Sequence, residues 1–149
     1  MSQLLQEIEA LRQPMKELND FIFDHPELGN EEFQAHELLT NLLEKEGFTV
    51  VREVSGLKTA FRGVYHVNGG GPKIGLLCEY DALEGLGHAC GHNLQGPSIC
   101  RATIALKRTL KAPCTLVVYG TPAEETASGK LVMAREGVFD DLDLAFMMH

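Results

Sequence analysis

The sequence predicts an α/β protein in which a mixed, mostly parallel sheet is covered by helices on both faces, a three-layer sandwich. Three observations lead to this prediction. Near the N-terminus, apolar residues recur every three or four positions, which indicates amphipathic helices. After residue 48 the pattern changes to runs of β-branched and apolar residues, separated by further helical stretches. These runs are apolar throughout, which is typical of strands buried on both faces of a sheet.

The N-terminal third is predicted to be helical. Apolar residues on one helical face include Leu4, Ile8 and Leu11, and the pattern continues to Ile22, while Pro14 indicates two helices or one kinked helix. A further helix is expected over residues 31–46, with Asn30 as its N-cap.

The remaining elements follow in alternation. Strands are expected over residues 48–54, 58–67, 73–79, 114–120 and 142–148, and helices over residues 95–110 and 128–136. The glycine-rich stretch 68–72 is expected to close a hairpin between the second and third strands. A phosphate-binding loop is the weaker alternative there, because no helix follows directly.

Composition and charge limit the classes of function. The chain has 149 residues, 44% hydrophobic and 23% charged, as expected for one globular domain. The net charge is −8, and the lysines and arginines do not cluster into a basic stripe, which argues against a nucleic-acid partner. No apolar run is long enough for a membrane span, so no membrane partner is expected. The start of the chain lacks a signal-peptide pattern and the four cysteines form no Cys-x-x-Cys pair, so a cytoplasmic location is expected.

Side chains able to bind a metal follow the ends of several predicted strands. They are Glu79, Asp81, His88, Cys90, His92, Glu124, Glu125 and His149. Each alone has an ordinary explanation, such as a solvated strand end, a helix-dipole partner or a buried cysteine. Sites in open α/β sheets form where strands end, so their coincidence favours a divalent metal site.

The residue types indicate hydrolysis. Thiolate and imidazole favour zinc-like ions, and carboxylates suit these or Mn²⁺. In an adjacent pair such as Glu124 and Glu125, one carboxylate can bind metal while the other takes a proton from water. A thiol hydrolase with Cys90 as its nucleophile is the rival interpretation. A dinucleotide-binding loop over residues 85–91 fits poorly, because its last glycine comes one residue late.

Five motifs in unbroken order carry a family resemblance. They are His25-Pro-Glu-Leu-Gly29, Asp81-Ala-Leu83, His88-Ala-Cys-Gly-His92, Thr121-Pro-Ala-Glu-Glu125 and a strand ending in His149. Together they resemble the M20 family of metallopeptidases, in its branch of N-acyl-amino-acid amidohydrolases. Residues 78–83 and 120–125 are most similar to aminobenzoyl-glutamate hydrolase and β-alanyl-lysine-type dipeptidases.

The resemblance implies a zinc-peptidase-like catalytic domain that holds two divalent ions, Zn²⁺ first and Mn²⁺ second. The residues that match metal ligands are Cys90, His92, Glu125 and His149. Glu124 matches the general base, and Asp81 falls beside the metals. Glu79 falls where other branches have a histidine ligand and is not counted as one. The implied substrates are small molecules, N-acyl amino acids or dipeptides, cleaved at an amide bond.

The resemblance also concerns the extent of the chain. Family members have a further histidine ligand, a dimerisation domain and a second catalytic half. Residues 1–149 are therefore expected to be the N-terminal portion of the catalytic domain, without the dimerisation domain. Whether the chain forms a homo-oligomer is left open. The alternative is a catalytically incompetent segment that binds metal or a partner.

Overall fold

A computed structural model of the protein describes residues 2–149 and places five strands in one mixed sheet, in the order β1-β2-β4-β3-β5. The strands are β1 (Thr49–Arg52), β2 (Phe61–Val67), β3 (Lys73–Cys78), β4 (Cys114–Gly120) and β5 (Leu144–Met147). β2 pairs antiparallel with both β1 and β4, whereas β3 pairs parallel with both β4 and β5. The predicted mixed sheet is confirmed, and its parallel half consists of β4, β3 and β5.

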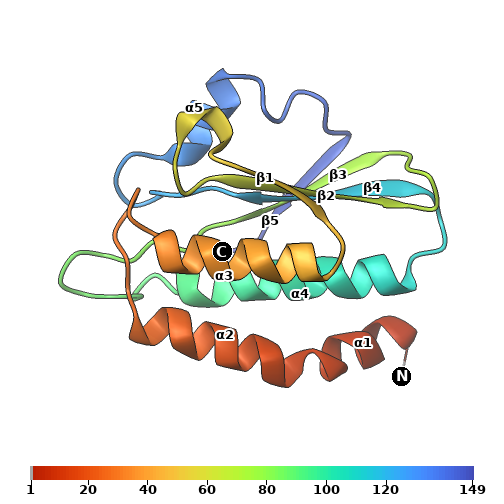
Figure 1. Cartoon of the computed structure of the whole chain (residues 1–149), viewed down its shortest axis with the longest axis horizontal. Helices are drawn as coiled ribbons and strands as arrows, with labels where there is room; N and C mark the ends of the chain where they lie inside the picture. Colours follow the sequence, from red (N-terminus) through yellow and green to blue (C-terminus); the bar gives the residue numbers. More distant parts are fainter. Residues whose placement is uncertain (1) are drawn as a thin grey trace.

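Helices cover both faces of this sheet (Figure 1). They are α1 (Gln3–Ala10), α2 (Arg12–Asp24), α3 (Phe33–Lys45), α4 (His92–Thr109) and α5 (Gly129–Arg135). α3 packs on β1 and β2, α4 packs on β3 and β4, and α1 and α2 form an outer layer against α4. α5 lies on the opposite face, beside the short helix η1 (Val54–Gly56). The α/β sandwich is thus confirmed, with one additional layer of helix.

The position of β4 at the centre of the sheet explains why its sequence is largely apolar. All seven of its residues are buried. Leu116 and Val118 point into the larger core under α3 and α4, while Val117 and Tyr119 join a second core with Met133 of α5. Successive side chains of a strand point to opposite faces, so a strand covered on both sides is apolar at nearly every position. The exception is Thr115, whose hydroxyl group lies 3.0 Å from Nδ1 of His66.

The N-terminal region forms two helices, one of the two arrangements that Pro14 indicates, but the predicted N-cap of α3 is wrong. α1 and α2 are separate, and Pro14 lies in the first turn of α2, where a missing amide proton costs little. Asn30 has a left-handed backbone (φ 67°) and lies outside α3. The carboxylate of Glu27 instead accepts hydrogen bonds from the first amides of α3, those of Gln34 and Ala35, at 3.0 Å.

The predicted hairpin between β2 and β3 is also wrong. β4 lies between these two strands and pairs with both. The glycine-rich loop 68–72 runs over the chain that enters β4: a Cβ at Gly71 would lie 2.5 Å from the carbonyl oxygen of Pro113. The largely apolar β4 occupies the centre because both of its faces are covered there.

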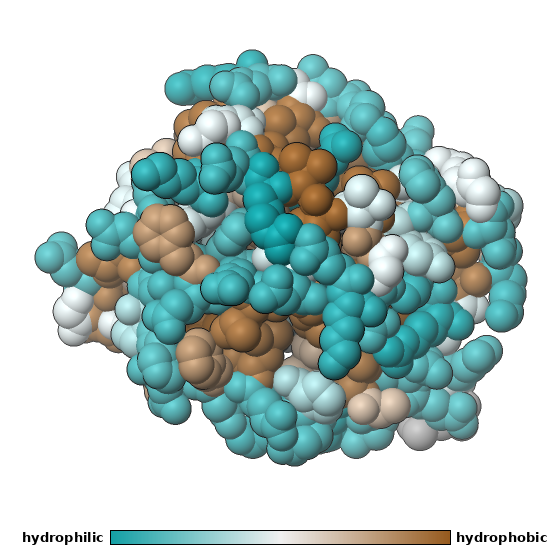
Figure 2. All heavy atoms as spheres, viewed as in Figure 1, coloured by the Kyte–Doolittle hydropathy of each residue, from teal (hydrophilic) through white to brown (hydrophobic). Residues whose placement is uncertain are grey.

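Hydrophilic residues cover most of the side shown in Figure 2, and hydrophobic residues are visible there in several separate patches. Within residues 2–149, no helix combines the length and the apolar character that crossing a membrane requires.

Gly120→Ala is expected to destabilise the protein by about 1–3 kcal/mol, because the core cannot accommodate an added methyl group there. Its Cβ would lie 2.1 Å from Cε1 of Phe61, whose side chain is fully buried. Urea unfolding measures the loss. Gly63→Ala is the matched control, since the nearest atom to its Cβ would be the end of the Leu43 side chain, at 3.1 Å. Equal losses in the two variants would contradict this explanation.

Candidate metal centre

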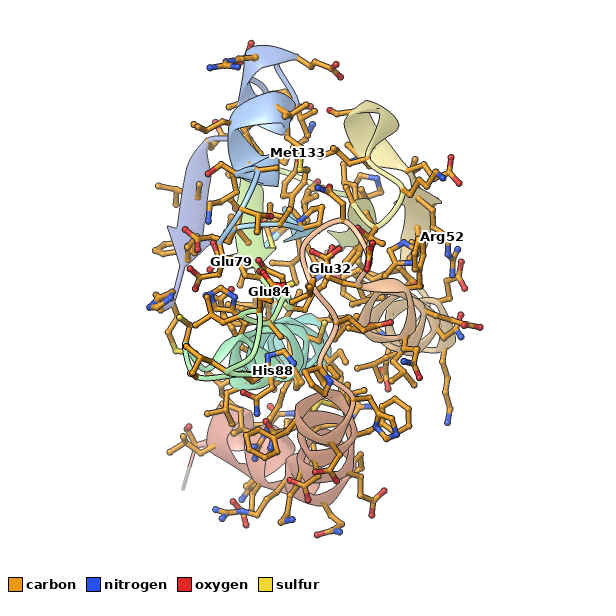
Figure 3. The ribbon with its side chains drawn as sticks, turned by 90° about the vertical axis from the view of Figure 1, so that its left-hand side faces the viewer. Glu32, Arg52, Glu79, Glu84, His88 and Met133 are labelled. Atoms are coloured by element: carbon orange, nitrogen blue, oxygen red, sulfur yellow. The ribbon has the colours of Figure 1, made fainter. Side chains whose placement is uncertain are left out.

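The candidate site lies at the edge of the sheet where the three parallel strands end. Glu79 and Asp81 follow β3, Glu124 and Glu125 follow β4, and His149 follows β5. Because parallel strands run in the same direction, these residues reach the same edge. Figure 3 views this side of the molecule and shows Glu79 between the sheet and α4. The first residue of α4, His92, completes the group.

His92 is the centre of this arrangement, and its ring is only 1% exposed. Its Nδ1 lies 3.0 Å from Oδ1 of Asp81 and 3.1 Å from the Asp81 backbone oxygen. Its Nε2 lies 3.2 Å from Oε2 of Glu79, 3.3 Å from Nε2 of His149 and 3.9 Å from Oε1 of Glu125. A carboxylate that accepts a hydrogen bond from Nδ1 orients the ring and leaves the lone pair of Nε2 available to bind a metal, as in metal-binding histidines.

Asp81 connects His92 to the Glu124–Glu125 loop. Its Oδ2 accepts a hydrogen bond of 3.0 Å from the backbone amide of Glu125. Burial raises the pKa of Asp81, but the hydrogen bonds from His92 and Glu125 outweigh it and hold the pKa below its ordinary value. Burial lowers the pKa of His92, yet its hydrogen bond to Asp81 leaves it raised overall.

Two overlapping groups of donor atoms fit a divalent cation. Glu79, His92 and His149 form one group, and His92, Glu124 and Glu125 form the other, with the donor atoms of each within 4.8 Å of one another. Imidazole nitrogens and carboxylate oxygens are ligands of Zn²⁺, and both also suit Mn²⁺. The chemistry of the residues therefore fits the predicted metal.

Cys90 lies beside these donors rather than within either group, as judged over residues 2–149. It is exposed, and its hydrogen bond to the Glu125 carboxylate, with the surrounding acidic groups, raises the pKa of its thiol. The thiolate is the form of cysteine that acts as a nucleophile and also the form that binds a metal, so the raised pKa does not distinguish the two interpretations of Cys90. The structure thus brings together five of the six predicted site residues and places Cys90 against Glu125.

Sequence reasoning missed Gln95 and Lys130, and it did not count Glu79 as a ligand. Glu79 is fully buried, and its Oε2 accepts a hydrogen bond of 3.1 Å from Nε2 of Gln95. Its Oε1 forms an ion pair with Nζ of Lys130, which also lies 4.0 Å from Oε1 of Glu124. Burial lowers the pKa of Lys130. No spacing rule could connect a lysine at the start of α5 to a glutamate after β3.

Small cavities flank the donors on two sides. One, of about 260 Å³, is lined by Cys90, Gly91, His92, Leu94, Gln95, Met148 and His149. The other, of about 290 Å³, is lined by Leu28, Ala82, Leu83, Glu84, Leu86, Glu125 and Thr126. The donors are therefore reachable by a small molecule.

Comparisons with known proteins find hydrolases and peptidases that are similar to this chain, although no family model matches it. The chain is 44% identical to one of the subunits of p-aminobenzoyl-glutamate hydrolase of Escherichia coli (strain K12), over 95% of the chain and 33% of that protein. It is 36% identical to Xaa-Arg dipeptidase of Homo sapiens, over 95% of the chain and 36% of that protein. The chain thus spans about a third of the length of these curated relatives.

A solved structure also has a similar fold. The YXEP protein of Bacillus subtilis, described as a dinuclear metal binding peptidase from the M20 family, superimposes with a TM-score of 0.84 and 26% sequence identity. The match covers 95% of this chain and 43% of that protein.

Proposed function

Because its homologues and structural neighbours are peptidases and amidohydrolases of the M20 family, we propose that this chain carries the metal site of a hydrolase that cleaves an amide bond in N-acyl amino acids or dipeptides. One observation carries the proposal. His92 has its Nδ1 held by Asp81, while its Nε2 faces the carboxylates of Glu79 and Glu125 and the ring of His149. This is the arrangement that a catalytic divalent ion requires.

The proposed cofactor is a pair of divalent ions, with Zn²⁺ preferred and Mn²⁺ second. The proposed ligands are Cys90, His92, Glu125 and His149. The two donor groups that share His92 contain His92, Glu125 and His149 but not Cys90, whose thiol instead contacts the Glu125 carboxylate. The dinuclear description of the Bacillus subtilis relative supports the number of ions. When bound, such ions polarise the amide carbonyl and lower the pKa of water.

The residues of the chain have separate tasks in the proposed reaction. Glu124, whose side chain is 34% exposed at the site, accepts the proton of the attacking water and passes it to the leaving amine. Asp81 holds the His92 ring and the Glu125 amide in place. Glu125 is less exposed, at 22%, which suits a ligand better than a proton carrier.

We further propose that residues 1–149 form the N-terminal portion of the catalytic domain, and that the dimerisation domain and the second catalytic half belong to the part of the relatives that this chain does not span. The alignment with only about a third of each relative supports a partial catalytic domain. We also propose the cytoplasm as the compartment, because the four cysteines form no Cys-x-x-Cys pair in the sequence.

Metal binding is the first test. Titration of the chelator-treated protein with Zn²⁺ or Mn²⁺ is expected to show saturable binding near two ions per chain and a raised melting temperature. An ion at about 100 times its dissociation constant stabilises the folded state by about 2.7 kcal/mol. A melting temperature unaffected by either ion would contradict the proposed metal centre.

Hydrolysis is the second test. An N-acetyl amino acid and p-aminobenzoyl-glutamate are offered to the metal-loaded protein, and cleavage is expected to stop when a chelator is added. Cleavage that survives chelation but is lost on thiol alkylation would instead support Cys90 as a nucleophile. Bound metal without cleavage would favour the alternative, a segment that binds metal but is not active by itself.

A further inference from the structure

Glu32 is a fully buried carboxylate outside the donor groups. Its Oε2 accepts a hydrogen bond of 2.7 Å from the hydroxyl group of Thr59. Its Oε1 accepts a hydrogen bond of 2.7 Å from the backbone amide of Ala123. Figure 3 shows Glu32 in the interior of the molecule, on the same side as Glu79. The carboxylate therefore joins the start of α3 to the loop that follows β4.

The residue that Glu32 holds has an unusual backbone conformation. Ala123 has φ +56°, in the left-handed region that residues with a side chain rarely adopt. Its carbonyl oxygen accepts hydrogen bonds from the amides of Ala127 (3.0 Å) and Ser128 (2.7 Å), so the chain turns tightly here. Such a conformation persists only where the surrounding structure holds it. The buried amide of Ala123 would lose its partner if the carboxylate were removed.

Two buried carboxylates hold the loop on either side of Glu124. The Glu32 carboxylate accepts a hydrogen bond from the amide of Ala123, which precedes Glu124. The Asp81 carboxylate accepts a hydrogen bond from the amide of Glu125, which follows Glu124. The segment that contains Glu32 also packs directly on this loop: a Cβ at Gly29 would lie 2.4 Å from Oγ1 of Thr126 and 2.9 Å from Cα of Ala123. The backbone of Glu124 and Glu125 is thus fixed from both directions.

We propose that Glu32 is a positioning residue of the hydrolase site, which holds Glu124 and Glu125 at the donor group through the backbone of Ala123. Glu32 itself touches neither the substrate nor the metal. This role rests on the proposed function, in which Glu124 is the general base and Glu125 is a metal ligand.

A glutamine can replace Glu32 in this role. Burial raises the pKa of Glu32 despite its hydrogen bonds to Thr59 and Ala123, so the pocket disfavours a charge there. The glutamine oxygen can still accept from the Ala123 amide, and its NH₂ group can donate to the Thr59 hydroxyl oxygen. Alanine can do neither.

The test compares Glu32→Ala, Glu32→Gln and Leu43→Ala in the full chain. Leu43 is fully buried in α3 and packs in the main core, so its variant controls for a general loss of stability. Two measurements are made: amide hydrogen exchange at residues 123–125, and Zn²⁺ affinity by competition with a chelating dye. Glu32→Ala is expected to speed exchange at Ala123 and to weaken Zn²⁺ binding about tenfold, the usual effect of losing a residue that supports ligands.

The controls are expected to separate positioning from stability. Glu32→Gln should remain within about threefold of the unmodified protein in Zn²⁺ affinity, and Leu43→Ala should lower the melting temperature without changing that affinity. Should Glu32→Ala not fold, Glu32→Asp replaces it, because the shorter side chain cannot reach both partners. A Glu32→Ala protein that behaves like Leu43→Ala would overturn the proposal, and so would a Glu32→Gln protein as impaired as Glu32→Ala.

Failure of the proposed function is recognised separately. If the unmodified chain binds no Zn²⁺, the hydrolase proposal fails, and hydrogen exchange alone decides the role of Glu32. Loss of protection confined to residues 123–125 would then support the positioning of this loop, and unchanged protection in Glu32→Ala would overturn it.

Discussion

Glu124→Gln is expected to leave Zn²⁺ bound and to lower the rate of amide hydrolysis by about 10²–10⁴-fold, the usual contribution of a general base. Glutamine has nearly the same shape as glutamate but cannot accept a proton from water. Since Glu124 is not one of the proposed ligands, metal affinity should change little. The measurement is kcat for hydrolysis of an N-acetyl amino acid by the metal-loaded protein, with a Zn²⁺ titration of the same preparation.

Two other glutamates provide the controls. Glu125→Gln removes a proposed ligand and should weaken Zn²⁺ binding together with activity. Glu136→Gln changes an exposed side chain at the end of α5, outside both donor groups and both flanking cavities, and it should leave kcat within about threefold. Undiminished turnover in Glu124→Gln would remove Glu124 as the base.

Lys130→Met is expected to lower the free energy of unfolding of the metal-free protein by about 3 kcal/mol. The substitution leaves the carboxylate of Glu79, which is fully buried, without its counter-charge. Breaking one side of a buried ion pair is strongly destabilising for this reason. Urea unfolding in the presence of a chelator measures the effect.

The double variant Glu79→Gln/Lys130→Met is the matched control. It removes both charges and keeps a side chain of similar shape beside Gln95, so its stability should return to within about 1 kcal/mol of the unmodified protein. The difference between the single and double variants isolates the interaction between the two residues. If both variants were destabilised equally, the ion pair would not be the cause.

Much of the site could be predicted from the sequence because the relevant rule is local. Asp81 follows one strand, Glu124 and Glu125 follow another, and His149 follows a third. Wherever these strands are parallel, their carboxyl ends meet at one edge of the sheet, whatever the order of the strands. His92 joins them because it begins the helix that packs on β3 and β4.

The supporting contacts could not be predicted, because they connect residues far apart in the sequence. Glu32 and Ala123 are separated by 91 positions, and neither has a feature that indicates the other. The hairpin prediction failed for a related reason: whether two successive strands pair depends on which strand needs burial on both faces, and β4 does. At α3, a local rule favoured Asn30, but the longer side chain of Glu27 accepts the hydrogen bonds from amides of the first turn.

The order of the strands in the sheet also has a consequence for folding kinetics. β2 and β3 each pair with β4 across long stretches of chain, and Ile74 of β3 pairs with Leu144 of β5 across nearly half of the sequence. Pairing of segments so distant in the chain makes folding slow. His149 reaches the other donors only once β5 has joined the sheet, and we expect this distant pairing, and with it the complete donor set, to form late. An ion that binds only the complete set therefore acts mainly by slowing unfolding, and it prolongs the lifetime of the folded protein more than it speeds refolding.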